Sequence, residues 1–311
     1  MGKIKTFLRV LKNDPKSIKR LFVANLSKTK ISHLIPDKAF LKMQYKSIFG
    51  KKLDLKNPKT FNEKLQWLKL YDRNPEYCRL VDKCDVKDYI AETIGEQYVI
   101  PTLGVWDRFE DIDFDSLPNQ FVLKCTHDSG STVICRDKAC FDVEVARRKL
   151  SRRLGKNLFW HGREWPYKNI KPRILAEAYM EDAKTLELRD YKFFCFDGEV
   201  KALFIATDRQ KEDEEVKFDF FAPDFNWLPF KQGHPNASVK PERPEHFEEM
   251  KMLATKLSSG MPHVRVDFYE ANGKVYFGEM TFFHFCGLVP FEPRDWDLKL
   301  GEYIKLPNAK L

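Results

Sequence analysis

The spacing of apolar residues along the chain predicts four helices. Apolar side chains recur at intervals of three or four residues in these segments, which places them on one helical face. Thr60 or Asn62 caps the first helix, and Gly95 lies near the end of the second. The predicted helices are Thr60–Tyr71, Asp82–Ile94, Val143–Leu154 and Glu245–Leu257.

Short apolar runs bounded by turn residues predict strands, several of them in hairpins. Asp-Gly and Asn-Gly turns join two pairs of these runs. Helices come first and hairpins later, which favours an α+β fold with mainly antiparallel sheets over a doubly wound parallel sheet. The predicted strands are Phe121–Cys125, Thr132–Cys135, Ile174–Met180, Tyr191–Phe196, Val200–Ala206, His263–Tyr269 and Val275–Thr281.

Positive charge is concentrated at the N-terminus. Residues 1–60 hold sixteen Lys and Arg against three Asp, a net charge of +13, whereas the whole chain carries +8. Such a segment suits an anionic membrane surface or a charged glycan, and no signature of nucleic-acid binding accompanies it. Phe7–Phe22 alternates apolar and basic residues. It predicts either two amphipathic helices on a membrane or a helical hairpin packed on the main body.

Composition limits the cellular setting. The 311 residues are 43% hydrophobic, enough for a globular protein with a real core. The seven cysteines form no CxxC pair, so we expect reduced thiols and a cytoplasmic protein. No apolar run is long enough to span a bilayer, and no signal peptide is expected.

Two carboxylates face each other in the last predicted hairpin. Asp267 and Glu279 interrupt its apolar strands, and Arg265 shares a strand face with Asp267. Paired carboxylates repel unless a cation lies between them, and hard oxygen ligands suit Mg²⁺ on a polyphosphate. The sequence therefore predicts a Mg²⁺–phosphate site here; an exposed hairpin with ordinary surface charges is the alternative.

Two further strands carry charged residues within apolar runs. Lys124 ends a strand just before the turn His127–Ser131, where an ammonium group and backbone amides can meet a phosphate. Glu177 lies within an apolar strand whose following residues can offer backbone groups to a purine. P-loop and Rossmann signatures are absent, so a nucleotide would be bound in another way.

In its order of charged residues the chain resembles the ATP-grasp superfamily, and several phrases look like the TupA-like ATP-grasp family of polysaccharide gene clusters. The resemblance covers about residues 45–290. It implies two α+β subdomains that hold ATP between antiparallel sheets. The phrases are Pro58–Trp67, Val81–Lys83, Arg163–Lys168, Asp190–Phe194 and Tyr276–Thr281.

The resemblance also implies roles for residues toward the nucleotide. It assigns Lys83 and Lys124 to the ATP phosphates. It assigns Glu177 and the backbone from Ala178 to Met180 to the adenine edge. The ribose could be bound by Glu181, Asp182 or Glu187.

Toward the transferred phosphate, the resemblance implies Arg265, with Asp267 and Glu279 as Mg²⁺ ligands. Thr281 stands where many ATP-grasp ligases have Asn. Because a hydroxyl is a weaker Mg²⁺ ligand than an amide oxygen, Thr281 leaves open whether one or two Mg²⁺ ions bind.

Other residues are candidates for substrate contacts. Lys192 could reach the γ-phosphate and Arg209 could grip a substrate carboxylate, although both could be solvated charges at strand ends. We expect a long loop over Asn157–Lys171. Its part His161–Tyr167 suits sugars and carboxylates and is the predicted acceptor loop. His284 could orient an attacking amine or pack in the core. The substrate candidates in and after this loop are Arg163, Trp165, Tyr167 and His284.

These features predict an ADP-forming carboxylate–amine ligase that uses ATP and Mg²⁺. The family suggests that an amino acid or another amine is joined to a uronic acid of a capsule, O-antigen or cell-wall polysaccharide, as a glycan or a nucleotide- or lipid-linked sugar. A sugar kinase on the same fold, a glycosyltransferase using Asp113 and Asp115, and a glycan-binding protein are alternatives. The expected domains are 1–57 (basic and helical), 58–120 (before the grasp), 121–180 (first subdomain) and 181–311 (second subdomain, with the metal site).

Overall fold

The computed structural model describes residues 23–27, 29–183, 188–208 and 215–308. The predicted amphipathic segment Phe7–Phe22 and the candidate residues Glu187 and Arg209 lie outside these ranges. The described part of the basic segment is helical, with η1 (Lys30–Leu34) and α3 (Asp37–Phe49). In the described residues no helix is both long and apolar enough to cross a membrane.

The first sheet has four antiparallel strands in the order β1-β4-β2-β3. Its small core packs the buried side of α7 (Val143–Leu154) against β2 and β4. One edge strand, β1, comes from the segment expected to precede the first subdomain. The strands are β1 (Thr102–Trp106), β2 (Phe121–Cys125), β3 (Val133–Cys135) and β4 (Ile174–Ala178).

The second sheet has six antiparallel strands in the order β11-β10-β5-β6-β7-β8. Phenylalanines from β5, β6 and β7 fill the larger core, and α9 (Phe247–Leu257) packs on this sheet. The strands are β5 (Arg189–Phe196), β6 (Glu199–Thr207), β7 (Lys217–Phe221), β8 (Trp227–Leu228), β10 (Val264–Ala271) and β11 (Lys274–Thr281).

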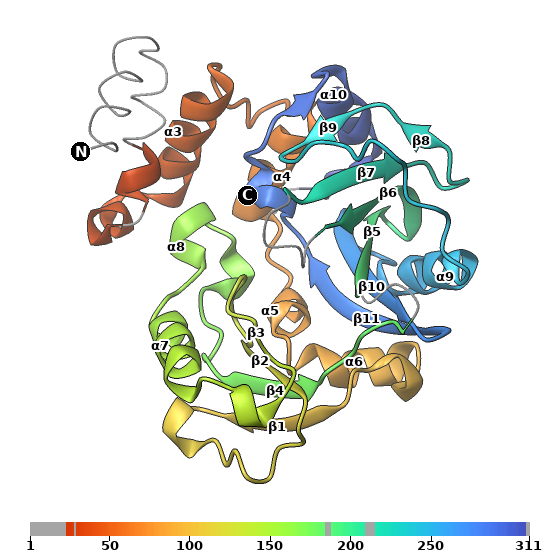
Figure 1. Cartoon of the computed structure of the whole chain (residues 1–311). Helices are drawn as coiled ribbons and strands as arrows, with labels where there is room; N and C mark the ends of the chain where they lie inside the picture. The colour runs from red at the N-terminus through yellow and green to blue at the C-terminus, as the bar shows by residue number, and fades with distance from the viewer. Residues whose placement is uncertain (1–22, 28, 184–187, 209–214, 309–311) are drawn as a thin grey trace, which may run out of the picture.

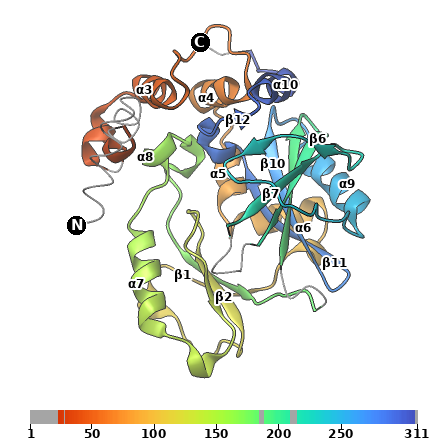
Figure 2. The ribbon, with the colours of Figure 1, turned by 45° about the horizontal axis from the view of Figure 1, so that its top comes forward.

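Helices lie between and beside the two sheets. Figure 1 shows the first sheet in the lower half and the second at the right, with α5 between them. The view in Figure 2 shows α3, α4 and α10 in a row along the top. The bounds are α4 (Phe61–Tyr71), α5 (Glu76–Val81), α6 (Val86–Thr93), α8 (Phe159–Gly162) and α10 (Asp295–Tyr303).

Short elements complete the chain. A two-stranded sheet joins β9 (Lys231–Gln232) to β12 (Phe291–Glu292). The remaining 3₁₀ turns are η2 (Glu96–Tyr98), η3 (Phe109–Asp111), η4 (Lys138–Cys140), η5 (Trp165–Tyr167) and η6 (His284–Gly287).

The predicted α+β class with antiparallel sheets is confirmed, as are the bounds of α7 and β2. The predicted helix Asp82–Ile94 begins later, at Val86, because the Asp82 carboxylate binds the backbone N–H groups of Cys84 and Asp85 in a turn. The segment expected to be a loop after α7 contains α8 and η5. All seven cysteines are free thiols, as predicted.

Candidate functional site

The β10–β11 hairpin places two acidic residues opposite each other. Asp267 pairs with Glu279 in the strand register, and Arg265 pairs with Thr281. The Arg265 guanidinium donates to both Asp267 oxygens, each at 2.7 Å. It also donates to Glu279 Oε1 at 2.7 Å and Thr281 Oγ1 at 3.0 Å. One arginine therefore binds all three residues that the resemblance proposes as metal ligands.

A lysine from the neighbouring strand joins this cluster. Lys192 on β5 lies opposite Asp267 on β10, and its Nζ contacts the Asp267 carboxylate and lies 3.3 Å from Asp190 Oδ1. Burial opposes ionisation of Glu279, but Lys192, Arg265 and Lys83 together hold its pKa well below the ordinary value. Glu279 is therefore an anion at neutral pH.

Charge balance makes the cluster suitable for Mg²⁺ with a polyphosphate. The Asp267 side chain has no solvent exposure, whereas that of Glu279 keeps 41%. Carboxylate and hydroxyl oxygens are the hard ligands that Mg²⁺ prefers. The cations Arg265 and Lys192 now satisfy Asp267, and phosphate oxygens are equally good partners for both cations. The residues present thus fit the predicted metal, with Asp267, Glu279 and Thr281 as candidate ligands.

His284 lies in the interior behind this cluster. Its side chain is 1% exposed, and its Nδ1 lies 2.7 Å from Arg265 Nη1. Burial, followed by the charge of Arg265, lowers the pKa of His284 well below the ordinary value. The neutral ring therefore accepts a hydrogen bond from Arg265 and fixes the guanidinium. Its predicted role toward an amine stays a prediction.

A second charged cluster lies on the first sheet. The buried Glu177 carboxylate contacts Lys87 Nζ at 2.7 Å through one oxygen and Lys124 Nζ at 2.5 Å through the other. Burial opposes ionisation of Glu177, but the two lysines outweigh it and lower the pKa of Glu177. Glu177, Lys87 and Lys124 together carry a net charge of +1. This positive charge favours a phosphate ligand.

Lys83 lies against the predicted turn. Its backbone N–H donates to Thr126 O at 3.1 Å, and its Nζ donates to the carbonyl of Asp128. Burial lowers the pKa of Lys83, and the charge of Glu279 opposes this lowering. Gly130 in this turn has φ of 84°, a conformation that suits glycine.

The segment after β4 lines a cavity of about 670 Å³. Ala178, Met180 and Glu181, all predicted to bind the nucleoside, face this cavity, and Tyr276 of β11 lies across from them. Asp182, predicted for the same task, lies beside a neighbouring cavity and accepts from Asn272 N at 2.9 Å. In this segment the Ala178 N–H donates to Pro101 O and the Glu181 carbonyl accepts from Asn272 Nδ2, each at 3.0 Å.

The predicted acceptor loop divides into two parts. The guanidinium of Arg163 is buried and lies 2.9 Å from Asp37 Oδ1, so Arg163 fastens this loop to α3. Trp165 is also buried, beneath Arg73. Tyr167 is half-buried, and burial, followed by the charge of Glu164, raises its pKa well above the ordinary value.

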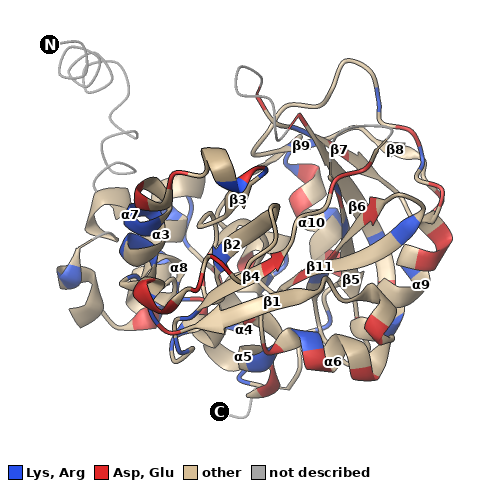
Figure 3. Cartoon of the chain, turned by 60° about the horizontal axis from the view of Figure 1, so that its bottom comes forward, with Lys and Arg blue, Asp and Glu red and all other residues tan. Residues whose placement is uncertain are grey.

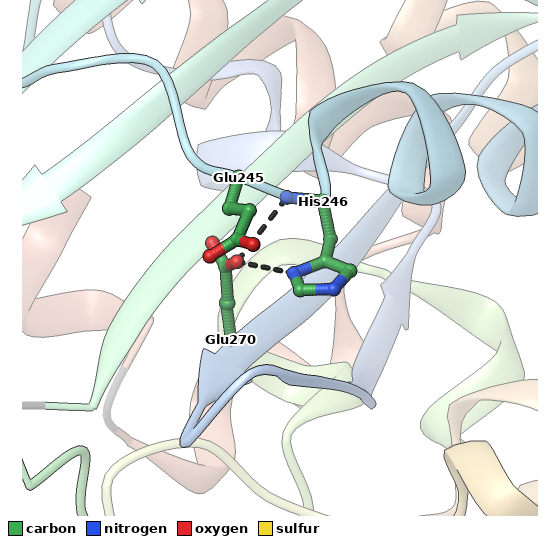
Figure 4. Close-up of side chains that lie close together, drawn as sticks. All are labelled: Glu245, His246 and Glu270. Atoms are coloured by element: carbon green, nitrogen blue, oxygen red, sulfur yellow. Dashed lines mark hydrogen bonds and ion pairs between the residues drawn. The ribbon is translucent and has the colours of Figure 1, made fainter.

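Three potential ligands also gather at the far end of β10, apart from the hairpin cluster. Figure 4 shows His246 pointing toward Glu270, with Glu245 beside them. His246 Nδ1 lies 2.6 Å from Glu270 Oε1. This hydrogen bond explains the arrangement without an ion.

Two charged residues near the candidate site were missed by sequence reasoning. Lys87 follows Lys83 by four residues, but α6 begins at Val86, so helical spacing does not relate the two lysines. Glu164 lies inside the predicted acceptor loop, but its burial beside Cys286 depends on a contact across 122 residues. Such a contact leaves no local signal.

Two antiparallel sheets, each with a cluster of paired charged side chains, define the class of an α+β protein with a charged candidate site. The family model described as TupA-like ATPgrasp matches residues 63–305. The chain belongs to this family, as predicted. No match was found among curated proteins.

Solved ATP-grasp ligases are distantly similar. A D-alanine–D-alanine ligase from Bacillus anthracis, complexed with ATP, is 17% identical over 66% of this chain and 55% of its own, with a TM-score of 0.37. The corresponding ligase from Helicobacter pylori is 16% identical over 81% and 70%, with a TM-score of 0.40. PsnB, complexed with Mg, ADP and a precursor variant, is 10% identical over 85% and 70%, with a TM-score of 0.41. This chain thus spans little more than half of the first ligase.

Proposed function

We propose that this protein is an ATP-dependent carboxylate–amine ligase whose phosphate-transfer site is the Arg265–Asp267–Glu279 cluster. The observation that carries the proposal is the Arg265 guanidinium bound to the facing carboxylates of Asp267 and Glu279. Lys192 contacts Asp267, and Lys124 and Lys87 contact Glu177 on the first sheet. Lys83 acts with Lys192 and Arg265 to lower the pKa of Glu279 against the effect of burial. Membership of an ATP-grasp family supports ATP and Mg²⁺ as the ligands.

In this proposal the substrate carboxylate attacks the γ-phosphorus of ATP, which yields an acyl phosphate and ADP. Arg265 and Lys192 stabilise the negative charge on the transferring phosphoryl group, and Lys124 and Lys83 hold the other phosphates. Mg²⁺ held by Asp267 and Glu279 supplies Lewis-acid charge neutralisation when it is bound. An amine then displaces the phosphate, and an amide forms.

Ala178, Met180 and Glu181 are proposed to bind the nucleoside, because they line the cavity between the sheets. Arg209, outside the described residues, and the half-buried Tyr167 remain candidates for substrate contacts. The substrate class we propose is a uronic acid of a cell-surface polysaccharide, joined to an amino acid. This choice is supported by the resemblance of the chain to a family of polysaccharide gene clusters.

We further propose that the basic N-terminal segment holds the enzyme at the anionic cytoplasmic face of the membrane. Ile31 and Leu34 beside Lys30 are 65% and 85% exposed. Figure 3 shows the blue positions of Lys and Arg along α3 and α7, at the left of the view. Exposed apolar residues with nearby cations suit a lipid surface.

The test is a thermal-shift titration with Mg·ATP, followed by phosphate release with uronic acids and amino acids. We expect stabilisation by Mg·ATP in the wild type and its loss in Lys124→Ala, with the exposed Lys256→Ala as matched control. Phosphate release that requires both a carboxylate and an amine supports ligation. Wild-type binding and turnover in both Lys124→Ala and Glu279→Ala would refute the assignment.

Product analysis separates the competing functions. A phosphorylated sugar would indicate a kinase, and the absence of any Mg·ATP thermal shift would indicate a non-catalytic protein. The glycosyltransferase alternative has less support, because Asp113 and Asp115 are exposed and the Asp113 carboxylate accepts from the backbone of Asp115 in a turn.

A further inference from the structure

A buried carboxylate lies where the predicted acceptor loop meets the segment after the metal hairpin. Glu164 is 6% exposed, and its Oε1 accepts from the Cys286 thiol at 2.7 Å. The acid directly precedes η5, and the thiol comes from η6, which begins three residues after Thr281. No step of phosphate transfer described above uses this pair.

The two segments are fixed to each other by a buried lysine. Lys69 Nζ on α4 donates to Gly162 O and to Cys286 O, each at 2.7 Å. Phe285, Cys286 and Gly287 all have positive φ angles of 48°, 56° and 58°. Such a run is costly for side chains other than glycine, and strain of this kind concentrates at functional sites. The backbone therefore holds the thiol on the Glu164 carboxylate at an energetic cost.

The carboxylate is also near the reaction centre. Cys286, which contacts Glu164, follows His284 by two residues, and His284 Nδ1 lies 2.7 Å from Arg265 Nη1. In the proposed phosphate site the cations Arg265 and Lys192 are already paired with the carboxylates Asp267 and Glu279. Glu164 thus offers a further carboxylate that is not one of the candidate metal ligands.

We propose that Glu164 receives the ammonium group of the incoming amine and removes a proton from it, so that the loop around Glu164 is the amine subsite of the ligase. This inference rests on the proposed function. An ammonium group has no free electron pair, and only the neutral amine attacks the acyl phosphate.

The proton balance of this step is complete. One proton passes from R–NH₃⁺ to the Glu164 carboxylate, and the freed electron pair forms the C–N bond. The C–O bond to phosphate breaks, and the leaving phosphate takes the second proton as HPO₄²⁻. Glu164 then returns its proton to solvent.

The charge environment suits a proton acceptor. Burial raises the pKa of Glu164, and Lys69 opposes this rise. An acceptor whose pKa is nearer neutrality than that of a free carboxyl group is better matched to catalysis at neutral pH. The charged and titratable groups that face Glu164 are Lys69, Tyr167, Arg265, Glu279 and Cys286.

The test compares two amines of different basicity in Glu164→Gln. With D-glucuronate or D-galacturonate as the carboxylate, hydroxylamine, which is mainly neutral at pH 7, traps the acyl phosphate without a base, whereas glycine needs deprotonation. We expect ligation of glycine to fall about 10²–10⁴-fold, with hydroxamate formation and the Mg·ATP thermal shift unchanged. The exposed Glu92→Gln is the matched control.

A second variant separates chemistry from folding. Cys286→Ala removes the thiol that stabilises the ionised Glu164, so the acid limb of the pH–rate profile with glycine should move to higher pH. Wild-type glycine ligation in Glu164→Gln, equal losses with both amines, or an unmoved acid limb in Cys286→Ala would overturn the proposal. Absence of hydroxamate in the wild type itself would refute the proposed function instead.

Discussion

Arg265 and Asp267 form a two-point ion pair within a single strand, with both carboxylate oxygens 2.7 Å from guanidinium nitrogens. The carboxylate is fully buried, and Lys192 contacts it as well. Asp267 therefore has no oxygen without a cationic partner. A metal ion can bind it only if Arg265 or Lys192 gains another anion.

The first prediction is that Mg²⁺ alone does not stabilise the protein. Without phosphate, Mg²⁺ would have to displace Arg265 or Lys192 from Asp267 and leave a buried cation unpaired, which is costly. With ATP the phosphates provide these cations with partners. A thermal-shift titration should show no change with MgCl₂ and a rise with MgCl₂ plus ATP. A clear rise with MgCl₂ alone, absent in Asp267→Asn, would contradict this coupling.

The second prediction concerns Glu177, the anion shared by Lys87 and Lys124. Glu177→Gln leaves Lys87 and Lys124, whose side chains are 12% and 15% exposed, without a counter-ion. It should lower the stability of the nucleotide-free protein by about 3–5 kcal/mol. Phosphates of ATP can replace the missing anion, so the shift caused by Mg·ATP should be larger than in the wild type.

Differential scanning calorimetry with and without Mg·ATP measures both quantities. The exposed Glu144→Gln on α7 serves as control, since its side chain is 64% exposed. A Glu177→Gln protein that is destabilised and no longer responds to Mg·ATP would show that Glu177 itself contacts the nucleotide.

The site could be predicted where its geometry is local. Asp267 and Glu279 are joined by a short Asn-Gly turn, and strand alternation alone places them opposite each other. Lys124 and Glu177 also meet, but the partner strands β2 and β4 are separated by about fifty residues, and only the family's order of residues connected them.

The remainder depended on contacts that the sequence does not encode locally. Arg163 was predicted to bind a substrate, yet it reaches Asp37, 126 positions earlier in the chain. The pairing of β1 with β4 likewise joins a segment expected to precede the grasp domain to its first sheet. Periodicity predicts which face of an element is buried, but it does not identify the partner that covers it.

The third prediction tests the start of α4, which supports Lys69. Thr60 Oγ1 accepts from Glu63 N at 3.2 Å, and Glu63 Oε2 accepts from Thr60 N at 3.2 Å, a reciprocal cap. Thr60→Ala should reduce the free energy of unfolding by about 0.5–2 kcal/mol. Urea denaturation measures this change. An unchanged midpoint would show that tertiary packing alone fixes the helix start.

The same cap should depend on pH. Burial opposes ionisation of Glu63, but the backbone N–H groups of Lys59 and Thr60 and the ammonium of Lys51 lower its pKa. A lowered carboxyl pKa stabilises the fold above the unfolded value, near 4.5, and this contribution is lost as pH falls through the folded pKa. The stability difference between wild type and Glu63→Gln should therefore shrink below about pH 4.5.

The fourth prediction concerns His246, at the start of α9. Its hydrogen bond to Glu270 raises the pKa of His246 above 6.5, against a smaller lowering by burial. A raised histidine pKa stabilises the fold fully below the unfolded value and ceases to do so as pH rises through the folded pKa. NMR titration of the ring should give a pKa above 6.5 in the wild type and a lower one in Glu270→Gln. Addition of Zn²⁺ during this titration distinguishes a metal site from an ion pair. Zn²⁺ bound to His246 would lower the apparent pKa of this residue. If His246 and Glu270 form only an ion pair, the pKa stays unchanged when Zn²⁺ is added.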